Sequence, residues 1–474
     1  MNQAGAGQGR TAGPPPLGMF LVVMLIFGII TSLHGMSPLA TYGLGSIFFL
    51  VAAIVLFLIP AGLVAAELGT SWKRDGGVYV WVSEAFGQRA GFVATWLQWF
   101  QNVIFWTVIL TSSAAMIALS LGWDGGTDNK LYTAAVVVGT IWLITLLTMF
   151  GLRTSGALGT IGSLGGTIVP GLLLIAFAAI YLLAGNPTNL TGASADLIPD
   201  LSKPGNISFG ISTIVIFAGV EVMATRVAEI RNPGYTYPRA TMISVVMIAV
   251  LLIPATLAIA VLVPSDQINI TAGIIQAMQT AVDDVWDVGL LVPLLALAIY
   301  IDSIGEIAGW MAGTPVAMAT AGRDGHLPRR FAERGKLGVA KPVLIGQAVI
   351  GSLISLLFIV EPSVSSMFWL LSAMLVQLYL MMYIMLFASA LKLRHSHPEI
   401  ERPFAIPGGR WGIRLACGVG IAFSIAAFAV GFIPPAGLPE ASALSHTLVL
   451  SCAIAFGALA PLAISRWSRS HPGV

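Results

Sequence analysis

The sequence predicts an all-α polytopic membrane protein with twelve transmembrane helices, and three observations support this fold class. The 474 residues are 57% hydrophobic and only 9% charged, with a mean hydropathy of +0.90, whereas a soluble domain carries about 25% charged residues. Twelve apolar segments each reach about the 20 residues that a bilayer-spanning helix needs. Lys and Arg fall almost entirely into alternate loops, as the positive-inside rule requires.

The loops between these segments predict the orientation of the chain. If residues 1–16 lie inside, every Lys and Arg is cytoplasmic except Lys130 and Lys203, so both termini are expected in the cytoplasm. Residues 1–16 are rich in Gly, Ala, Pro and Gln and carry one charge, Arg10, so they are expected to be a disordered tail. They lack the compact apolar region and cleavage site of a signal peptide. The twelve predicted segments lie near residues 17–42, 46–68, 90–121, 131–151, 157–184, 206–230, 240–263, 288–319, 341–360, 364–391, 411–433 and 443–465.

The first segment has polar and helix-breaking residues at its centre. Residues 28–38 contain glycines, hydroxyls and a proline where a spanning helix is normally most apolar. This pattern predicts a break in the helix, and broken helices in transporters bind substrate near the bilayer midplane. The unpaired N–H groups of half-helices suit a substrate carboxylate. His34 lies in this stretch, either as a hydrogen-bonded residue at the outer edge of the break or as a proton switch.

The sixth segment repeats this feature and adds an acid. Gly219 lowers helix propensity, and Glu221 places a carboxylate at membrane depth, where such groups are costly and usually functional. A helix broken in mid-membrane is favoured, with its break lining a cavity. The alternative is a continuous helix with a glycine kink and a pore-facing Glu221. Because the two interrupted segments are five apart, residues 17–184 and 206–391 are predicted to be inverted repeats.

Four stretches of the chain resemble a known superfamily. They are AAELGTSWKRDGGVYVWVSEAFGQRAGF, GVEVMATRVAEIRNPGYTYPRA, EIAGWMAGTPVAMATAGRDGHLP and RPFAIPGG. Together they resemble the amino acid–polyamine–organocation (APC) superfamily and, within it, the bacterial glutamate/GABA antiporter family, from about residue 17 onward. The resemblance implies a LeuT-type fold with a ten-helix core (17–391), a cytoplasmic loop (392–410), two peripheral helices (411–465) and a short cytoplasmic tail (466–474). It also implies alternating access for small amino acids or their amines.

Helices three and ten carry further polar candidates. Gln98 and Asn102 share one helical face with Trp106. Their amides either contact a substrate or hydrogen-bond neighbouring helices. By resemblance, Tyr379 and Tyr383 correspond to tyrosines that line the transport path, and their hydroxyls need partners at membrane depth.

Helix eight brings two acids into the membrane. Asp302, Glu306, Gly309 and Gly313 fall on one helical stripe. The glycines are expected to pack against another helix, so the acids should point into the bundle. Two like charges at this spacing repel, and at least one should keep its proton or meet a cation. By resemblance, Glu306 matches a glutamate in the transport path. Asp302 has no counterpart, which puts glutamate as the substrate in doubt, unless Asp302 sits at a water-facing outer mouth.

These features predict a secondary active transporter for amino acids, or amino acid/amine pairs, working as an exchanger or a proton symporter. The alternatives are a non-transporting receptor or scaffold and a polyamine carrier. The chain lacks H-E-x-x-H and G-x-S-x-G, so it is not expected to be an enzyme. Cys417 and Cys452 form no disulfide framework or metal spacing, and no cofactor or metal is expected. Scattered charges exclude a nucleic-acid partner.

The expected partners are the substrate, protons and the lipid of a bacterial inner membrane, with the protein a monomer or homodimer. Glu221 is either a proton site or a structural tie between the sixth-segment break and its neighbours. The candidate substrate-binding residues are Ile29, Ile30, Thr31, Ser32, Leu33, Phe217, Ala218, Gly219, Gln98, Asn102, Tyr379 and Tyr383, and the candidate proton-coupling or gating residues are Glu306, Glu221 and Asp302.

Overall fold

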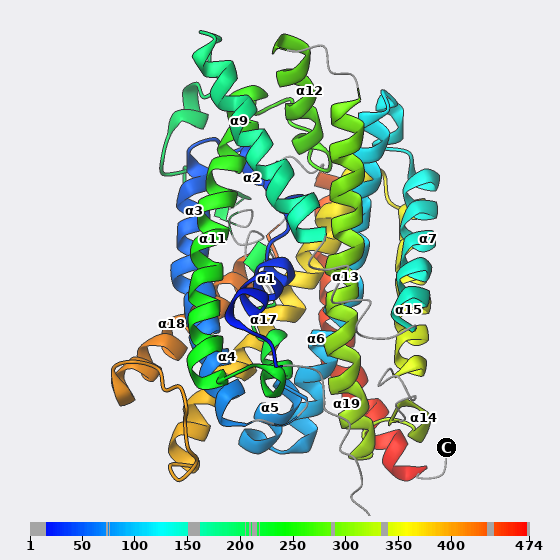
Figure 1. Cartoon of the computed structure of the whole chain (residues 1–474). Helices are drawn as coiled ribbons and strands as arrows, with labels where there is room; N and C mark the ends of the chain where they lie inside the picture. Colours follow the sequence, from blue (N-terminus) through cyan, green and yellow to red (C-terminus); the bar gives the residue numbers. More distant parts are fainter. Residues whose placement is uncertain are drawn as a thin grey trace, which may run out of the picture.

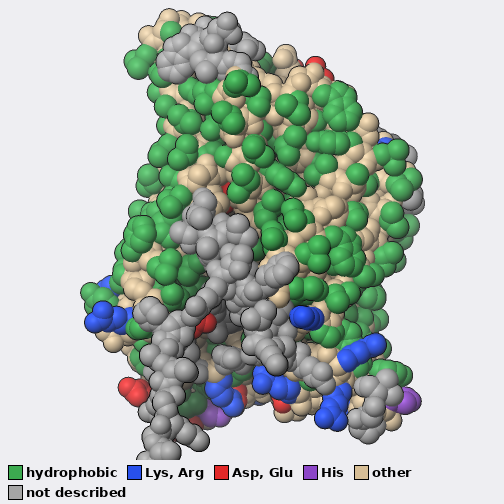
Figure 2. All heavy atoms as spheres, turned by 45° about the vertical axis from the view of Figure 1, so that its right-hand side comes forward, with side chains coloured by type: hydrophobic (Ala, Val, Ile, Leu, Met, Phe, Trp, Pro, Cys, Tyr) green, Lys and Arg blue, Asp and Glu red, His purple; other side chains and the backbone are tan. Residues whose placement is uncertain are grey.

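In the computed structural model, the described part of the chain is helical apart from loops, turns and one isolated β-bridge between Leu17 and Ile230. The long helices run side by side as one bundle (Figure 1). Hydrophobic side chains cover the middle of the face in Figure 2, and Lys and Arg gather toward one end, here called the basic end. The structure describes residues 16–72, 74, 76–149, 162–203, 205–207, 210, 216–217, 219–285, 290–332, 340–433 and 440–471.

Eleven helices among the described residues are long and apolar enough to cross a membrane, and they match eleven of the twelve predicted segments. The prediction of an all-α polytopic membrane protein is therefore confirmed, and the count of twelve stays a prediction. The spans are Met19–Ala40 (α1 Met19–Ile30, η1 Leu33–Gly35, α2 Met36–Ala40), Gly45–Ser71 (α3 Gly45–Ala53, η2 Ile54–Leu58, α4 Ile59–Ser71), α6 Gln88–Ser120, α7 Lys130–Met149, Ser163–Leu183 (η4 Ser163–Ile168, α9 Val169–Leu183), α11 Pro233–Leu262, α13 Leu291–Arg323, Lys341–Ile359 (α15 Lys341–Ser355 and α16 Leu357–Val360), α17 Val364–Ser396, α18 Gly409–Val430 and Thr447–Ser470 within α19 Glu440–Ser470.

Short helices connect or cap these spans. They are α5 Val78–Phe86, η3 Asp124–Gly126, η5 Gly192–Ala195, η7 Met223–Glu229, α12 Gly273–Val285 and α14 Arg329–Ala332.

The first span is interrupted at the predicted place. Helix α1 ends at Ile30, and Thr31 and Ser32 take extended conformations before η1 begins. Both side chains are buried. The irregular backbone therefore lies inside the protein, which is where a break at membrane depth is tolerated.

The described residues of the sixth predicted segment, 206–230, form no long helix. Gly219 has φ +111°, and the next residues form a turn and the 3₁₀-helix η7. Glycine adopts such a φ without the steric cost that a side chain brings. This backbone fits the predicted break better than the continuous, kinked helix. Ala218 lies outside the described residues, as do 204, 208–209 and 211–215.

Two predicted helix boundaries are too early. Helix α17 continues past residue 391 to Ser396, and α19 continues past residue 465 to Ser470. Parts of the predicted loop 392–410 and tail 466–474 are therefore helical. Basic side chains in the last turns, Arg394 and Arg469, interact favourably with the helix C-terminus. Of the predicted disordered tail, residues 1–16, the structure describes only residue 16.

His326 ties the loop after α13 to the C-terminal helix α19. Its Nδ1 lies 2.7 Å from Ser465 Oγ, and Arg469 Nη2 donates to its Nε2 at 3.1 Å. The ring stacks on Phe92 of α6 at 5.2 Å. Burial, and then the positive charge of Arg469, lower the pKa of His326 from 6.5 to about 4. The imidazole is thus neutral where it joins these elements.

This contact predicts a loss of stability in acid. Between pH 6.5 and about 4 the unfolded chain binds a proton at His326 that the folded protein excludes, so the free energy of unfolding falls as the pH falls. The apparent unfolding temperature of the detergent-solubilised protein should drop across this window, and by less in His326→Gln. The exposed His395 supplies the control, since His395→Gln should keep the wild-type profile. Equal profiles for His326→Gln and wild type would contradict the buried neutral imidazole.

Candidate functional site

Buried polar atoms without a partner gather at the break in the first span. The hydroxyls of Thr31 and Ser32 form no hydrogen bond within the described part of the chain. The Ser32 side chain interacts with the carboxyl group of Glu306 on α13, but neither Ser32 Oγ nor Glu306 Oε1 has a hydrogen bond of ordinary geometry to a described residue. Buried polar atoms are normally hydrogen-bonded. The break therefore presents the Ser32 hydroxyl and a carboxyl oxygen of Glu306 beside each other, and the adjacent Thr31 adds a second hydroxyl without a described partner.

Gly219 brings the sixth segment to the same place. A Cβ on Gly219 would lie 2.6 Å from Trp310 Cζ2 and 3.0 Å from Ile29 Cγ2. The Trp310 ring also contacts the Tyr379 ring edge-on, with centroids 6.4 Å apart. The two irregular stretches thus meet at Trp310, which the sequence analysis did not single out. Its position one helical turn after Glu306 was the available signal.

The other predicted residues of these two stretches are also in the interior. Ile30, Leu33 and Phe217 are buried, and Ile29 is partly buried. Their apolar side chains pack in the core.

Glu221 is fully buried and accepts three hydrogen bonds. Tyr379 and Tyr383 of α17 each donate to one of its carboxyl oxygens at 2.5 Å. Gln98 Nε2 of α6 donates at 2.8 Å. Three predicted site residues therefore converge on a fourth. These hydrogen bonds join the sixth segment to α6 and α17. They fit the alternative in which Glu221 ties the break in the sixth segment to its neighbours.

Asn102 continues the polar face of α6. Its Nδ2 donates to Thr314 Oγ1 of α13 at 3.2 Å. The amide nitrogens of Gln98 and Asn102 thus both donate to neighbouring elements of the protein. This fits the alternative in which these amides hydrogen-bond neighbouring helices. Asn102 Oδ1 is buried without a partner in the described residues, so this oxygen can still accept from a ligand.

Asp302 faces a different neighbour from Glu306. Its side chain is 5% exposed and accepts a hydrogen bond from Thr167 of η4. A Cβ on Gly166 would lie 2.3 Å from Asp302 Cβ, so the glycine admits the acid between the helices. This burial does not fit a water-facing outer mouth. The pairing with Thr167 was not foreseen, because the sequence does not say which helix faces α13.

His34 lies at the edge of a small cavity beside the break. Its Nε2 is 2.8 Å from Ser303 Oγ, which is 2.8 Å from Ser113 Oγ. These contacts fit the interpretation of His34 as a hydrogen-bonded residue at the edge of the break.

The cavity beside His34 has a volume of about 50 Å³. It has room for a few waters at roughly 10–15 Å³ each but not for an amino acid. The cavity is lined by Ser32, His34, Gly35, Pro38, Leu39, Phe105, Val108, Ile109, Ile216, Phe368, Trp369 and Ser372.

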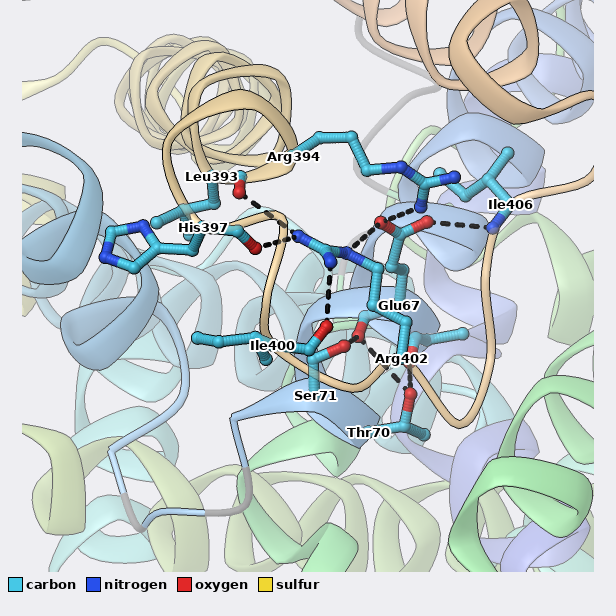
Figure 3. A network of polar contacts seen from close by, with 10 residues as sticks. Glu67, Thr70, Ser71, Leu393, Arg394, His397, Ile400, Arg402 and Ile406 are labelled. Carbon is cyan, nitrogen blue, oxygen red and sulfur yellow. Dashed lines mark hydrogen bonds and ion pairs between the residues drawn. The ribbon is translucent and has the colours of Figure 1, made fainter.

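A second polar network lies toward the basic end (Figure 3). The buried carboxylate of Glu67 in α4 pairs with Arg394 of α17 and, at 3.3 Å, with Arg402 Nε. Its other oxygen accepts from Ile406 N at 2.8 Å. Arg402 also donates to three carbonyl oxygens between residues 393 and 400. The segment that precedes α18 is thereby fixed against α4, which the sequence analysis missed because the partners are far apart in the chain.

Among the described residues, no group of three or more His, Cys, Asp or Glu side chains is placed to hold a metal ion. The polar groups at and around the two breaks are hydroxyls, amides and carboxyl groups.

Comparison with known proteins shows the family. The sequence profile of the family described as "Amino acid permease" matches residues 17–458. An uncharacterized transporter of Legionella pneumophila is 34% identical over 423 residues, covering 89% of this chain and 90% of the relative. A glutamate/gamma-aminobutyrate antiporter of Lactococcus lactis is 26% identical over 452 residues, covering 94% and 90%. A probable agmatine/putrescine antiporter of Lactococcus lactis is 24% identical over 403 residues, covering 84% and 83%. These matches confirm the resemblance to the APC superfamily, and the chain belongs to the amino acid permease family.

Proposed function

We propose that this membrane transporter exchanges amino acids, or an amino acid for an amine, at a site between the breaks of its first and sixth segments. One observation carries the proposal: Ser32, at the break of segment one, lies beside the buried carboxyl group of Glu306. The end of α1 also meets the sixth segment there, because Ile29 and Trp310 both lie against Gly219. The relatives support an antiporter, since one is named for glutamate and gamma-aminobutyrate and another for agmatine and putrescine.

The groups at the break suit both ends of an amino acid. The hydroxyls of Thr31 and Ser32 can donate to the α-carboxylate. The carbonyl oxygens at the end of α1, with the negative end of its dipole, attract the ammonium group, and so does an ionised Glu306. Asn102 Oδ1 can accept a further hydrogen bond. Alternating access requires the site to open to each side of the membrane in turn.

A competition screen tests this proposal. Purified protein in proteoliposomes should take up a labelled amino acid by a saturable process that unlabelled substrates inhibit. The screen should include acidic, neutral and cationic amino acids, agmatine and putrescine. Inhibition by polyamines alone would favour the polyamine carrier, and no uptake above protein-free vesicles would favour a receptor or scaffold.

Glu306 is the group that we propose for proton coupling. Its Oε1 is unpaired among the described residues, whereas Glu221 has three donors. Gln cannot release a proton, so in Glu306→Gln the ratio of uptake rates at acidic and neutral pH should approach one. Glu221→Gln is the comparison and should keep more of the pH dependence. If both variants keep the wild-type profile, neither acid is the coupling site.

Asp302 is the group that we propose for selecting amine-bearing substrates. A buried carboxylate one turn from Glu306 repels the side chain of glutamate and attracts a second amine. Cationic or neutral amine-bearing amino acids should then compete better than glutamate. Asp302→Asn should weaken inhibition by the cationic ones roughly tenfold, which corresponds to about 1.4 kcal/mol. Asp200→Asn, at an exposed position, is the control. Strongest inhibition by glutamate, unchanged in Asp302→Asn, would restore an acidic substrate.

We place the protein in a bacterial inner membrane as a monomer or homodimer, with both termini cytoplasmic. Residues 206–230 then form the sixth span in chain order, which brings the total to twelve. A LeuT-type core of two inverted repeats, residues 17–184 and 206–391, accounts for the matching breaks. The gathering of Lys and Arg at the basic end supports this orientation (Figure 2).

A further inference from the structure

A groove at the basic end shares no residue with the candidate substrate site. It has a volume of about 1100 Å³ and lies between α4, the start of α11 and the segment before α18. Its apolar lining includes Leu63, Met242, Ile243 and Phe404. This volume slightly exceeds the range of about 300–1,000 Å³ typical of small-molecule pockets.

The groove continues into a lipid-facing surface on α11. Met242, Ile243, Val246 and Val250 are 38, 44, 59 and 67% exposed, and their spacing places them along one side of the helix. Helix α11 stands at the edge of the bundle next to α3 and α4 (Figure 1). In a spanning helix, an exposed apolar stripe faces acyl chains. An acyl chain lying on this stripe leads directly into the groove.

Two charged side chains of opposite sign line the groove. The Arg239 guanidinium stacks on the Tyr235 ring, with its central carbon 3.6 Å from the ring centroid, and one of its nitrogens donates to Tyr235 O. Stacking fixes the plane of the guanidinium and leaves N–H groups at its edge for a phosphate. Glu401 lines the groove from the segment before α18. Neither residue forms an ion pair with another residue that the structure describes.

The segment before α18, which carries Glu401, forms one wall of the groove and is held in place by Glu67 of α4. Arg402, the neighbour of Glu401, pairs with Glu67, and Ile406 N donates to the same carboxylate. Pro403 and Phe404 of this wall face the groove. Arg239 is therefore carried by helix α11, and Glu401 by the segment that Glu67 holds in place.

We propose that this groove binds one phospholipid of the leaflet at the basic end, with an ethanolamine headgroup. Arg239 takes the phosphate, Glu401 takes the primary ammonium, and one acyl chain lies along α11. A phosphatidylglycerol headgroup offers Glu401 no cation, and its phosphate is repelled by that carboxylate. A phosphatidylcholine headgroup has a cation without an N–H to donate. The charges thus favour phosphatidylethanolamine over both.

Native mass spectrometry of delipidated full-length protein tests the proposal. Titration with palmitoyl-oleoyl phosphatidylethanolamine should reveal one saturable lipid, bound about tenfold more tightly than the glycerol or choline lipid. Arg239→Gln should lose about tenfold in affinity for the ethanolamine lipid. Glu401→Gln should lose the preference for it over the glycerol lipid. Arg410→Gln, an exposed arginine outside the groove lining, should behave as wild type.

Two results would overturn the assignment: equal affinity of the wild type for the three lipids, or equal losses in Arg239→Gln and Arg410→Gln. A photoactivatable phosphatidylethanolamine gives the position without any substitution. Adducts on residues 235–250 or 401–407 support the groove, and adducts confined to other spans contradict it.

Discussion

Replacing Gly219 with Leu is expected to reduce transport to the level of protein-free vesicles while the protein still inserts into the membrane. The backbone at Gly219 has φ +111°, a conformation that costs a non-glycine residue roughly 1–3 kcal/mol. A Cβ there would also lie 2.6 Å from Trp310 Cζ2, so the side chain would push Trp310 away from the two breaks. The initial rate of amino-acid uptake into proteoliposomes measures the effect.

Gly139→Leu is the matched control for this substitution. Gly139 lies on the exposed side of α7 with no atom within 4 Å of an added Cβ. Leu at this lipid-facing position should leave uptake near the wild-type rate. Size-exclusion profiles identify variants that are folded, and wild-type uptake by folded Gly219→Leu would disprove the role of this backbone in the site.

Glu221→Leu is expected to lower the yield of folded protein severely. It removes the acceptor for Tyr379, Tyr383 and Gln98 at once. Each buried donor left without a partner costs about 1–3 kcal/mol, and the three costs together approach the 5–15 kcal/mol by which domains are typically stable. Glu221→Gln keeps an acceptor oxygen and should be affected much less. Fluorescence-detected yield and the apparent unfolding temperature measure the difference.

The two tyrosines provide a check on this explanation. If they act through Glu221, the losses from Tyr379→Phe and Tyr383→Phe should not add when combined, because they share one partner. Additive losses, or a Glu221→Leu protein as stable as wild type, would show that the carboxylate is not the tie between the sixth segment and α17.

Local sequence patterns predicted the spans and the break at Thr31–Ser32, because hydropathy, glycine and proline act within a few residues. They predict the end of α17 too early, because basic residues such as Lys392 and Arg394 are common in loops but also favourable at a helix C-terminus. Periodicity indicated that Asp302 and Glu306 point into the bundle. It could not show that Thr167 meets one acid and Ser32 the other.

Long-range pairings account for the rest of the difference. The contact between Glu67 and Arg402 joins residues that are 335 positions apart in the chain. The local sequence around either residue does not indicate its partner. The position of Trp310 one turn after Glu306 is visible in the sequence, but its approach to Gly219 is a property of the fold. The sequence thus predicted candidate groups, and tertiary packing decided which of them share a site.

Counter-transport in proteoliposomes tests the central claim most directly. Vesicles containing the wild-type protein are loaded with an unlabelled amino acid identified by the competition screen, and entry of the labelled compound is followed. An alternating-access exchanger predicts saturable uptake that is faster into loaded than into empty vesicles, and Gly219→Leu should abolish the acceleration. Uptake that does not saturate and that loading does not change would contradict a carrier whose substrate site lies between the two breaks.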